Sequence, residues 1–184
     1  MDLLKKTLKA SAIGAITASL AFGVMDAKAE TAGTNIVATV QNAFTFVETQ
    51  PLAYGTFVAI NHATDTSTIV MSIAGVPSYN NPGAARITEI VAGQQGIFDI
   101  TAAAPSTDID VSYTSPVLLS CATCTGSEPD FSVATFVDDS TAGTVTTSAT
   151  GEVTLNVGAT LTTVAGAVYE DGAYSGAYTV TANY

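Results

Sequence analysis

The two cysteines of the chain, Cys121 and Cys124, form the pair whose spacing has the clearest chemical content. They could close a small disulfide, remain as free or intermolecular thiols, or serve metal or redox chemistry. A thioredoxin-like role needs the pair at a helix start after a βαβ pattern, which is absent from the surrounding sequence. Zinc needs two more ligands, and the single histidine, His62, lies far away in the sequence. A disulfide is the leading interpretation, and no metal site is expected.

The acidic residues occur in short groups that do not follow a calcium-loop pattern. Such groups usually lie at loop tips or on the solvated faces of strands. Nothing in the sequence marks two of these carboxylates as facing one cleft, and there is no G-x-S-x-G nucleophile motif. We therefore expect neither an enzyme nor a bound cofactor. The groups are Asp108 and Asp110, Glu128 and Asp130, Asp138 and Asp139, and Glu170 and Asp171.

Residues 1–29 have the three parts of a secretory signal peptide. Lysines follow the first methionine, residues 10–25 are apolar and rich in small side chains, and Ala27-Lys28-Ala29 fits the rule for signal-peptidase cleavage. The apolar run is shorter than the ~20 residues that a membrane-spanning helix needs. The sequence predicts export through the periplasm, to the cell surface or the medium, where the oxidising compartment favours a disulfide.

Cleavage after Ala29 would leave a strongly acidic chain. The whole chain has five basic and 16 acidic residues, and all four lysines lie within residues 1–29. Arg86 is then the one lysine or arginine that remains. Because neutralising phosphates or anionic headgroups requires Lys and Arg, we expect no nucleic-acid partner. We also expect no membrane insertion of the mature chain, since no second stretch is long and apolar enough.

Alternation with a period of two residues recurs after the leader and predicts strands with one buried face. Residues 108–113 place Ile109, Val111 and Tyr113 on one face, and residues 152–157 alternate in the same way. Residues 67–73 are expected to place Ile69, Met71 and Ile73 together. Turn-forming groups separate these runs, as at residues 80–83, 92–96, 126–129, 141–143 and 170–172. Many short strands predict one antiparallel β-sandwich over residues 48–184.

Residues 30–47 form an N-terminal extension with its own alternation. Ile36, Ala38 and Val40 share one face, and Val37, Thr39 and Gln41 share the other. This pattern predicts a strand, either the first strand of the chain's own sheet or a donor strand that completes the sheet of a neighbouring subunit.

Three segments together resemble the family called domain of unknown function 4402. They are Leu52-Ala53-Tyr54-Gly55-Thr56-Phe57, residues 155–161 and the C-terminal segment 172–184 with its repeated tyrosines. More distantly, the chain is similar to the spore-coat-protein-U-like subunits of archaic chaperone-usher pili, which also end in a turn and a terminal aromatic strand.

This resemblance implies an immunoglobulin-like sandwich, which in the pilus relatives lacks one strand. Each subunit there accepts the N-terminal extension of the next, and a periplasmic chaperone fills the gap before an outer-membrane usher exports the subunit. In this chain Ile36, Ala38 and Val40 would fill the groove. The groove edge that a chaperone contacts would be formed by Tyr178, Val180, Ala182 and Tyr184. Pairing the open edge with a partner strand also removes an aggregation hazard.

Two functions follow from these observations. The first is a structural, pilin-like subunit of a secreted bacterial fibre, a homo-polymer assembled through strand exchange. The second is a self-complete, monomeric β-sandwich that acts as a surface or periplasmic binding module or adhesin. The mark of the second function would be an N-terminal strand that pairs within its own chain.

Overall fold

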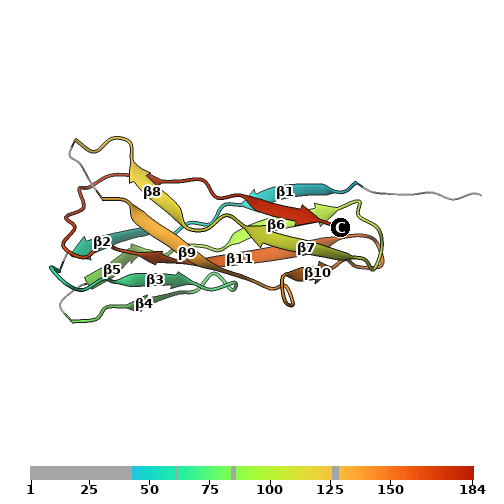
Figure 1. The fold of residues 1–184 in the computed structure, drawn as a ribbon, viewed down its shortest axis with the longest axis horizontal. Helices are drawn as coiled ribbons and strands as arrows, with labels where there is room; N and C mark the ends of the chain where they lie inside the picture. The colour runs from blue at the N-terminus through green and yellow to red at the C-terminus, as the bar shows by residue number, and fades with distance from the viewer. Residues whose placement is uncertain (1–42, 61, 84–85, 126–128) are drawn as a thin grey trace, which may run out of the picture. The chain divides into compact units, whose positions relative to one another are not determined.

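The structure is a computed structural model that describes residues 43–60, 62–83, 86–125 and 129–184. These residues form thirteen strands and no helix, and every strand pairing between them is antiparallel (Figure 1). The strands are β1 (Thr45–Gln50), β2 (Thr56–Ile60), β3 (Thr68–Met71), β4 (Pro77–Asn80), β5 (Arg86–Val91), β6 (Gly96–Thr101), β7 (Asp108–Tyr113), β8 (Val117–Cys121), β9 (Phe131–Asp138), β10 (Thr144–Thr146), β11 (Val153–Thr162), β12 (Tyr174–Ser175) and β13 (Val180–Asn183). The expected all-β, sandwich-like fold is confirmed.

The central strand of the fold is β11. The largest sheet has the order β1-β6-β11-β9-β8-β12, and β3 and β4 attach to it through β11. The first half of β11 pairs with β6, and Thr160–Thr162 pair with β3 along the same edge. Gly158 lies where the partner changes, and a methyl group there would come 2.1 Å from the carbonyl oxygen of Met71. The glycine therefore lets the end of β3 approach β11 closely.

Two smaller sheets complete the domain. One has the order β10-β7-β13, and the other consists of β2 and β5. Apolar side chains between the sheets form two clusters, which lie in opposite halves of the domain. The first includes Ile69, Met71 and Phe131 and is covered by β2 and β5, whereas the second includes Ile109 and Leu155 and is covered by β7 and β10 (Figure 1). Each fully buried aliphatic side chain contributes roughly 1.5–3 kcal/mol through removal from water.

Two of the predicted strands match the structure closely. Ile109 and Val111 of β7 are buried, while Asp108 and Asp110 face solvent. β11 also buries Leu155 and Val157, as the alternation of residues 152–157 predicts.

The prediction for residues 67–73 is right for Ile69 and Met71 and wrong for Ile73. β3 ends at Met71, and Ile73 is 38% exposed. The chain turns at once, because the Gly75 amide donates to the Ser72 carbonyl and the Val76 amide donates to the Ser72 hydroxyl. The local turn therefore ends the alternation one residue before Ile73.

The predicted signal peptide, residues 1–29, and the donor-strand residues Ile36, Ala38 and Val40 lie outside the described residues. Of the extension 30–47, the structure describes the last residues, and Thr45–Val47 belong to β1. Within the described part of the chain there is no helix of the length and apolar character that crossing a membrane requires.

Candidate functional site

Cys121 and Cys124 form a disulfide at the end of β8, with an S–S distance of 2.00 Å and Cα atoms 5.5 Å apart. The sulfurs are covered by the segment that leads into β12. A methyl group on Gly172 would lie 2.6 Å from Sγ of Cys121 and 2.8 Å from Sγ of Cys124. The predicted pairing is therefore present, and the backbone at Gly172 packs directly on it.

Two hydrogen bonds and a short strand pairing also hold the segment that leads into β12. The Thr125 amide donates to a carboxylate oxygen of Glu170 at 3.0 Å, and the Tyr174 hydroxyl donates to the Glu170 carbonyl at 3.2 Å. β12 itself is two residues long and pairs with β8 at Cys121 and Ser120. Residues 170–175 are therefore attached to the disulfide loop, to the end of β8 and, through the ring of Tyr174, to Phe131 of the first core cluster.

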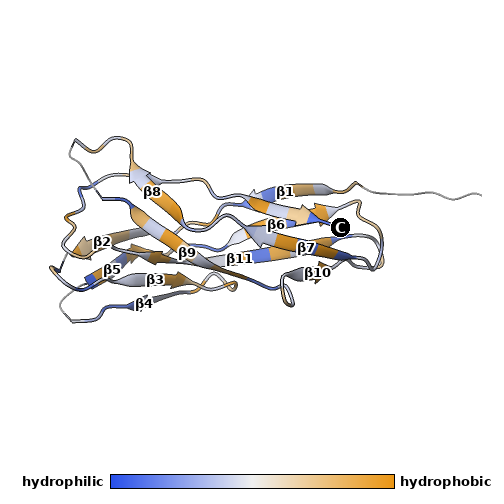
Figure 2. Ribbon diagram, in the orientation of Figure 1, coloured by the Kyte–Doolittle hydropathy of each residue, from blue (hydrophilic) through white to orange (hydrophobic). Residues whose placement is uncertain are grey.

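A largely apolar groove of about 950 Å³ lies between β2 and residues 169–176, the segment that includes β12. Among the described strands, β2 pairs with β5 alone and β12 pairs with β8 alone, so each has one edge without a strand partner. Figure 2 shows hydrophobic residues along β2, β8 and β9, which contribute to the groove. The groove is lined by residues 52–59, Ile90, Val117, Leu119, Phe131, Val133, Phe136, Leu161, residues 169–176 and Tyr178.

Aromatic rings form the deepest part of the groove. Phe131, which is 2% exposed, stacks on Tyr169 with ring centroids 4.0 Å apart and meets Tyr174 edge to face at 4.9 Å. Phe57 of β2 packs against the same ring from the other wall, at 5.5 Å. Phe131 is therefore shared by the first core cluster and by both walls of the groove.

The four residues predicted at the groove edge separate in the structure. Tyr178 lines the groove, and its ring packs against Phe98 and Phe136. Val180 and Ala182 pack against the second core cluster, in a strand that pairs with β7. Tyr184 contacts the ring of Phe44, and its hydroxyl accepts a hydrogen bond from the Ala104 amide. The chain thus leaves the groove after Tyr178, before β13 begins.

Two tyrosine hydroxyls near the groove are buried and make no hydrogen bond with another described residue. They belong to Tyr54 and Tyr178. Burial, and to a lesser extent the Glu48 carboxylate, raises the pKa of Tyr178 to about 12. Burial, and then the nearby Tyr178, raises the pKa of Tyr54 further above its ordinary value. Both hydroxyls are therefore neutral over the physiological pH range.

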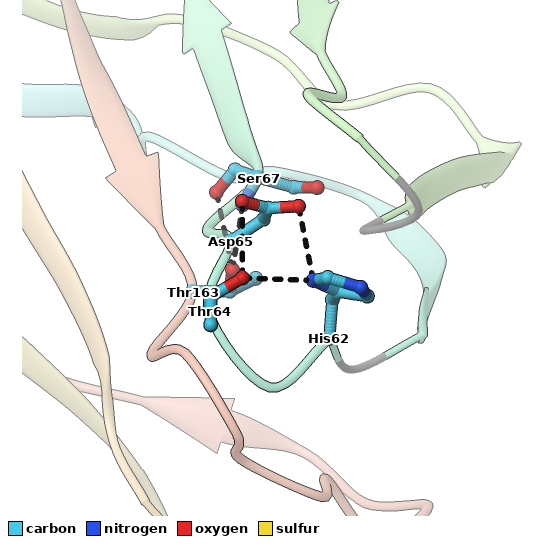
Figure 3. A network of polar contacts seen from close by, with 5 residues as sticks. All are labelled: His62, Thr64, Asp65, Ser67 and Thr163. Carbon is cyan, nitrogen blue, oxygen red and sulfur yellow. Dashed lines mark hydrogen bonds and ion pairs between the residues drawn. The ribbon is translucent and has the colours of Figure 1, made fainter.

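The single histidine stabilises a loop (Figure 3). Nδ1 of His62 lies 2.9 Å from Oδ2 of Asp65, and the Thr64 hydroxyl lies 3.5 Å from that Nδ1 and 3.5 Å from Oδ1 of Asp65 (Figure 3). The neighbouring Ser67 amide donates to the Thr163 hydroxyl at 2.8 Å, which joins this loop to the end of β11. The Ser67 hydroxyl is buried and does not contact His62. The geometry is that of a loop closure rather than of an activated nucleophile.

Carboxylates on the sheet surfaces pair with threonines on neighbouring strands. Thr146 donates to Asp108 at 2.7 Å, and Thr144 donates to Asp110 at 3.0 Å. Asp108 also borders a smaller hollow of about 420 Å³. No cluster of three or more His, Cys, Asp or Glu residues with metal-binding geometry occurs among the described residues.

β1 contains the described end of the N-terminal extension. It pairs with β6 of its own chain, from Thr45 opposite Thr101 to Gln50 opposite Ile97. Leu52, two residues after β1, already lines the groove. Phe44 and Leu52 are therefore separated by β1, whose six residues span ~20 Å.

A family model described as Domain of unknown function (DUF4402) matches residues 44–184. The chain belongs to this family. The match begins just before β1 and includes all thirteen strands, so the groove and the disulfide loop lie within the DUF4402 domain.

Comparison with curated proteins gave no match for the chain. No solved structure matched it either.

Sequence reasoning missed most of the groove. Residues 52–57 drew attention as part of the family resemblance, and Tyr54 and Phe57 do line the groove. Strand alternation does not distinguish the floor of a groove from a closed core. The groove residues of β8 and β9, among them Val117, Leu119 and Phe131, follow this ordinary alternation. The usable signal in the sequence is the short apolar run before Gly55; the one-sided pairing of β2 emerges only from the structure.

Proposed function

We propose that this protein is a structural, pilin-like subunit of a secreted bacterial surface fibre, assembled by donor-strand complementation. The observation that carries the proposal is the apolar groove between the unpaired edges of β2 and β12. Strands in a sheet lie about 4.7–4.9 Å apart, so one added strand pairs with both edges where these lie roughly 9–10 Å apart. It would join the β2-β5 pair to the largest sheet.

The proposed occupant of the groove is the extension of a second copy of the chain. Ile36, Ala38 and Val40 would face the aromatic floor, and the backbone would pair with the strand edges. Thr34 to Asn42 spans about 26 Å when extended, which suits the ~23 Å of chain from Leu52 to Ala59. Entry into its own groove would require the chain to reverse just before Phe44, which favours insertion into a neighbour.

The proposal includes an extracellular location, reached through the periplasm. It also includes a periplasmic chaperone and an outer-membrane usher as partners, since an open edge beside an apolar groove needs cover before assembly. The role is structural rather than enzymatic. The acidic composition disfavours nucleic acid as a partner.

The test compares two chains by electron microscopy, one starting at Glu30 and one starting at Ala43. The second retains β1 and all the other described strands. We expect filaments from the first chain alone, and monomers from the second that bind a synthetic peptide of residues 30–42. The proposal is overturned if the chain starting at Glu30 stays monomeric and the chain starting at Ala43 does not bind the peptide. A first chain that is monomeric because its own extension fills its groove would overturn polymer assembly.

A second candidate function is a self-complete binding module or adhesin, favoured by the pairing of β1 with β6 of the same chain. In this case the groove would accept a ligand, and residues 30–42 would be dispensable. The same two chains separate the candidates, because a binding module remains a folded monomer with or without this segment.

A further inference from the structure

We propose that the Cys121–Cys124 disulfide is a redox-sensitive latch that holds one wall of the groove. The wall is the segment Glu170–Tyr174, which lines the groove on one side and covers the disulfide loop on the other. This inference rests on the proposed function only for the identity of the strand that the groove receives.

The wall has two attachments, the ring of Tyr174 on Phe131 at its end and the disulfide loop beneath Gly172. Gly172 lies against both sulfurs, and Sγ of Cys124 lies 3.9 Å from the Tyr174 hydroxyl. The bonds between Thr125 and Glu170 are exposed, and β12 contributes two residues of pairing. Residues 170–173, before Tyr174, are exposed, and segments held by exposed hydrogen bonds open at low free-energy cost.

The disulfide lies in a surface loop, where a reductant can reach the sulfurs once the wall over them opens. Both cysteines are half-buried, and the two residues between them, Ala122 and Thr123, are exposed. Reduction by a dithiol breaks the S–S bond. Two electrons and two protons pass to the cysteines, giving two thiols, and the dithiol becomes a disulfide. The loop then loses its covalent closure, and the wall loses the surface on which Gly172 packs.

The latch would restrict strand binding in the groove to oxidising compartments, which the chain reaches on export. In a reducing compartment the wall is loose and the groove accepts a strand weakly, whereas oxidation fixes the wall and completes the acceptor. The oxidant required is a protein or small-molecule disulfide, the chemical class present in oxidising compartments.

Hydrogen exchange tests the latch in the chain that starts at Glu30, oxidised or treated with dithiothreitol. We expect reduction to accelerate exchange of residues 169–176 by roughly tenfold or more, and to leave β11 unchanged. Unchanged exchange at residues 169–176 would overturn the latch. Equal acceleration throughout the domain would also overturn it, because the disulfide would then be a general staple.

Two variants sharpen the result. Gly172→Ala pushes the wall away from the sulfurs and should give fast exchange at residues 169–176 without reductant. Ala122→Ser, an exposed change in the same loop, should behave as the parent chain. Wild-type exchange at residues 169–176 in Gly172→Ala would contradict the packing argument.

Peptide binding then connects the latch with the groove. A labelled peptide of residues 30–42 should bind the oxidised chain that starts at Ala43 roughly tenfold more tightly than the reduced chain. Equal binding to both forms would overturn control of the groove by the disulfide. A peptide that binds neither form counts against the proposed function, while the exchange experiment still decides the latch.

Discussion

Phe131 shows how one side chain serves both the core and the groove. It is almost fully buried, stacks on Tyr169 and contacts Phe57 and Tyr174 from opposite walls. Removing the ring would therefore weaken the first core cluster and lower the floor of the groove at the same time.

We expect Phe131→Ala to lower the free energy of unfolding by about 3–5 kcal/mol, the usual cost of truncating a buried aromatic ring. Urea unfolding measures this change. Leu118→Ala is the matched control, because Leu118 is 56% exposed on β8, and its change should lie within about 0.5 kcal/mol. Similar costs for the two variants would contradict the assignment of Phe131 to the core.

The raised pKa of Tyr178 predicts a loss of stability at alkaline pH. A tyrosine in the unfolded chain ionises near pH 10, and in the folded domain this one ionises near pH 12. Because the pKa is higher in the folded state, the contribution of the neutral Tyr178 hydroxyl to the free energy of unfolding is complete below pH 10. This contribution is lost as the pH rises toward 12. We expect urea midpoints to fall over this window.

Tyr178→Phe should make that fall shallower, because one ionisation that opposes folding is removed. Tyr184→Phe, at the exposed C-terminal residue, serves as the comparison: loss of the hydrogen bond from the Ala104 amide should lower the midpoint at every pH and leave the alkaline fall as steep as in the parent chain. If both variants show the parent's pH dependence, burial of the Tyr178 hydroxyl does not govern alkaline stability.

At the scale of the elements, β11 holds the fold together because it contacts β3, β6 and β9. Along one edge of β11 the partner changes from β6 to β3, and this change depends on the lack of a side chain at Gly158. We expect Gly158→Ala to destabilise the domain by about 1–3 kcal/mol, since its methyl group would overlap the Met71 carbonyl. Thermal unfolding checks this, and a cost below about 0.5 kcal/mol would mean that β3 shifts freely.

The strands were predictable where their pattern is local, and their arrangement was not. Alternation alone located β7 and the buried face of β11, because each strand places every second residue in one core. The prediction that Ile73 shares the buried face was wrong because a turn begins at Ser72 and ends the strand. The shared edge of β11 and the groove between β2 and β12 depend on contacts between distant segments, which period counting does not detect.

At the scale of the whole molecule, the scarcity of basic residues makes the domain resistant to trypsin. Within residues 30–184, Arg86 is the one trypsin site, and it lies in β5 opposite Ile60 of β2. We expect the folded chain to give at most two fragments, divided after Arg86, as mass spectrometry would show. Arg86→Gln should remain uncut even when unfolded, and any additional tryptic fragment would mean that the leader is retained.

Assembly by strand donation also requires that the two faces of the extension differ. If Ile36, Ala38 and Val40 enter the groove, Ala38→Asp buries an unpaired carboxylate on an aromatic floor, which costs several kcal/mol. Thr39→Asp places the same charge on the opposite face, away from the floor. Electron microscopy should therefore show filaments for Thr39→Asp and none for Ala38→Asp. The reverse result would mean that the face with Val37 and Thr39 is inserted, and filaments from both variants would remove the groove from the assembly mechanism.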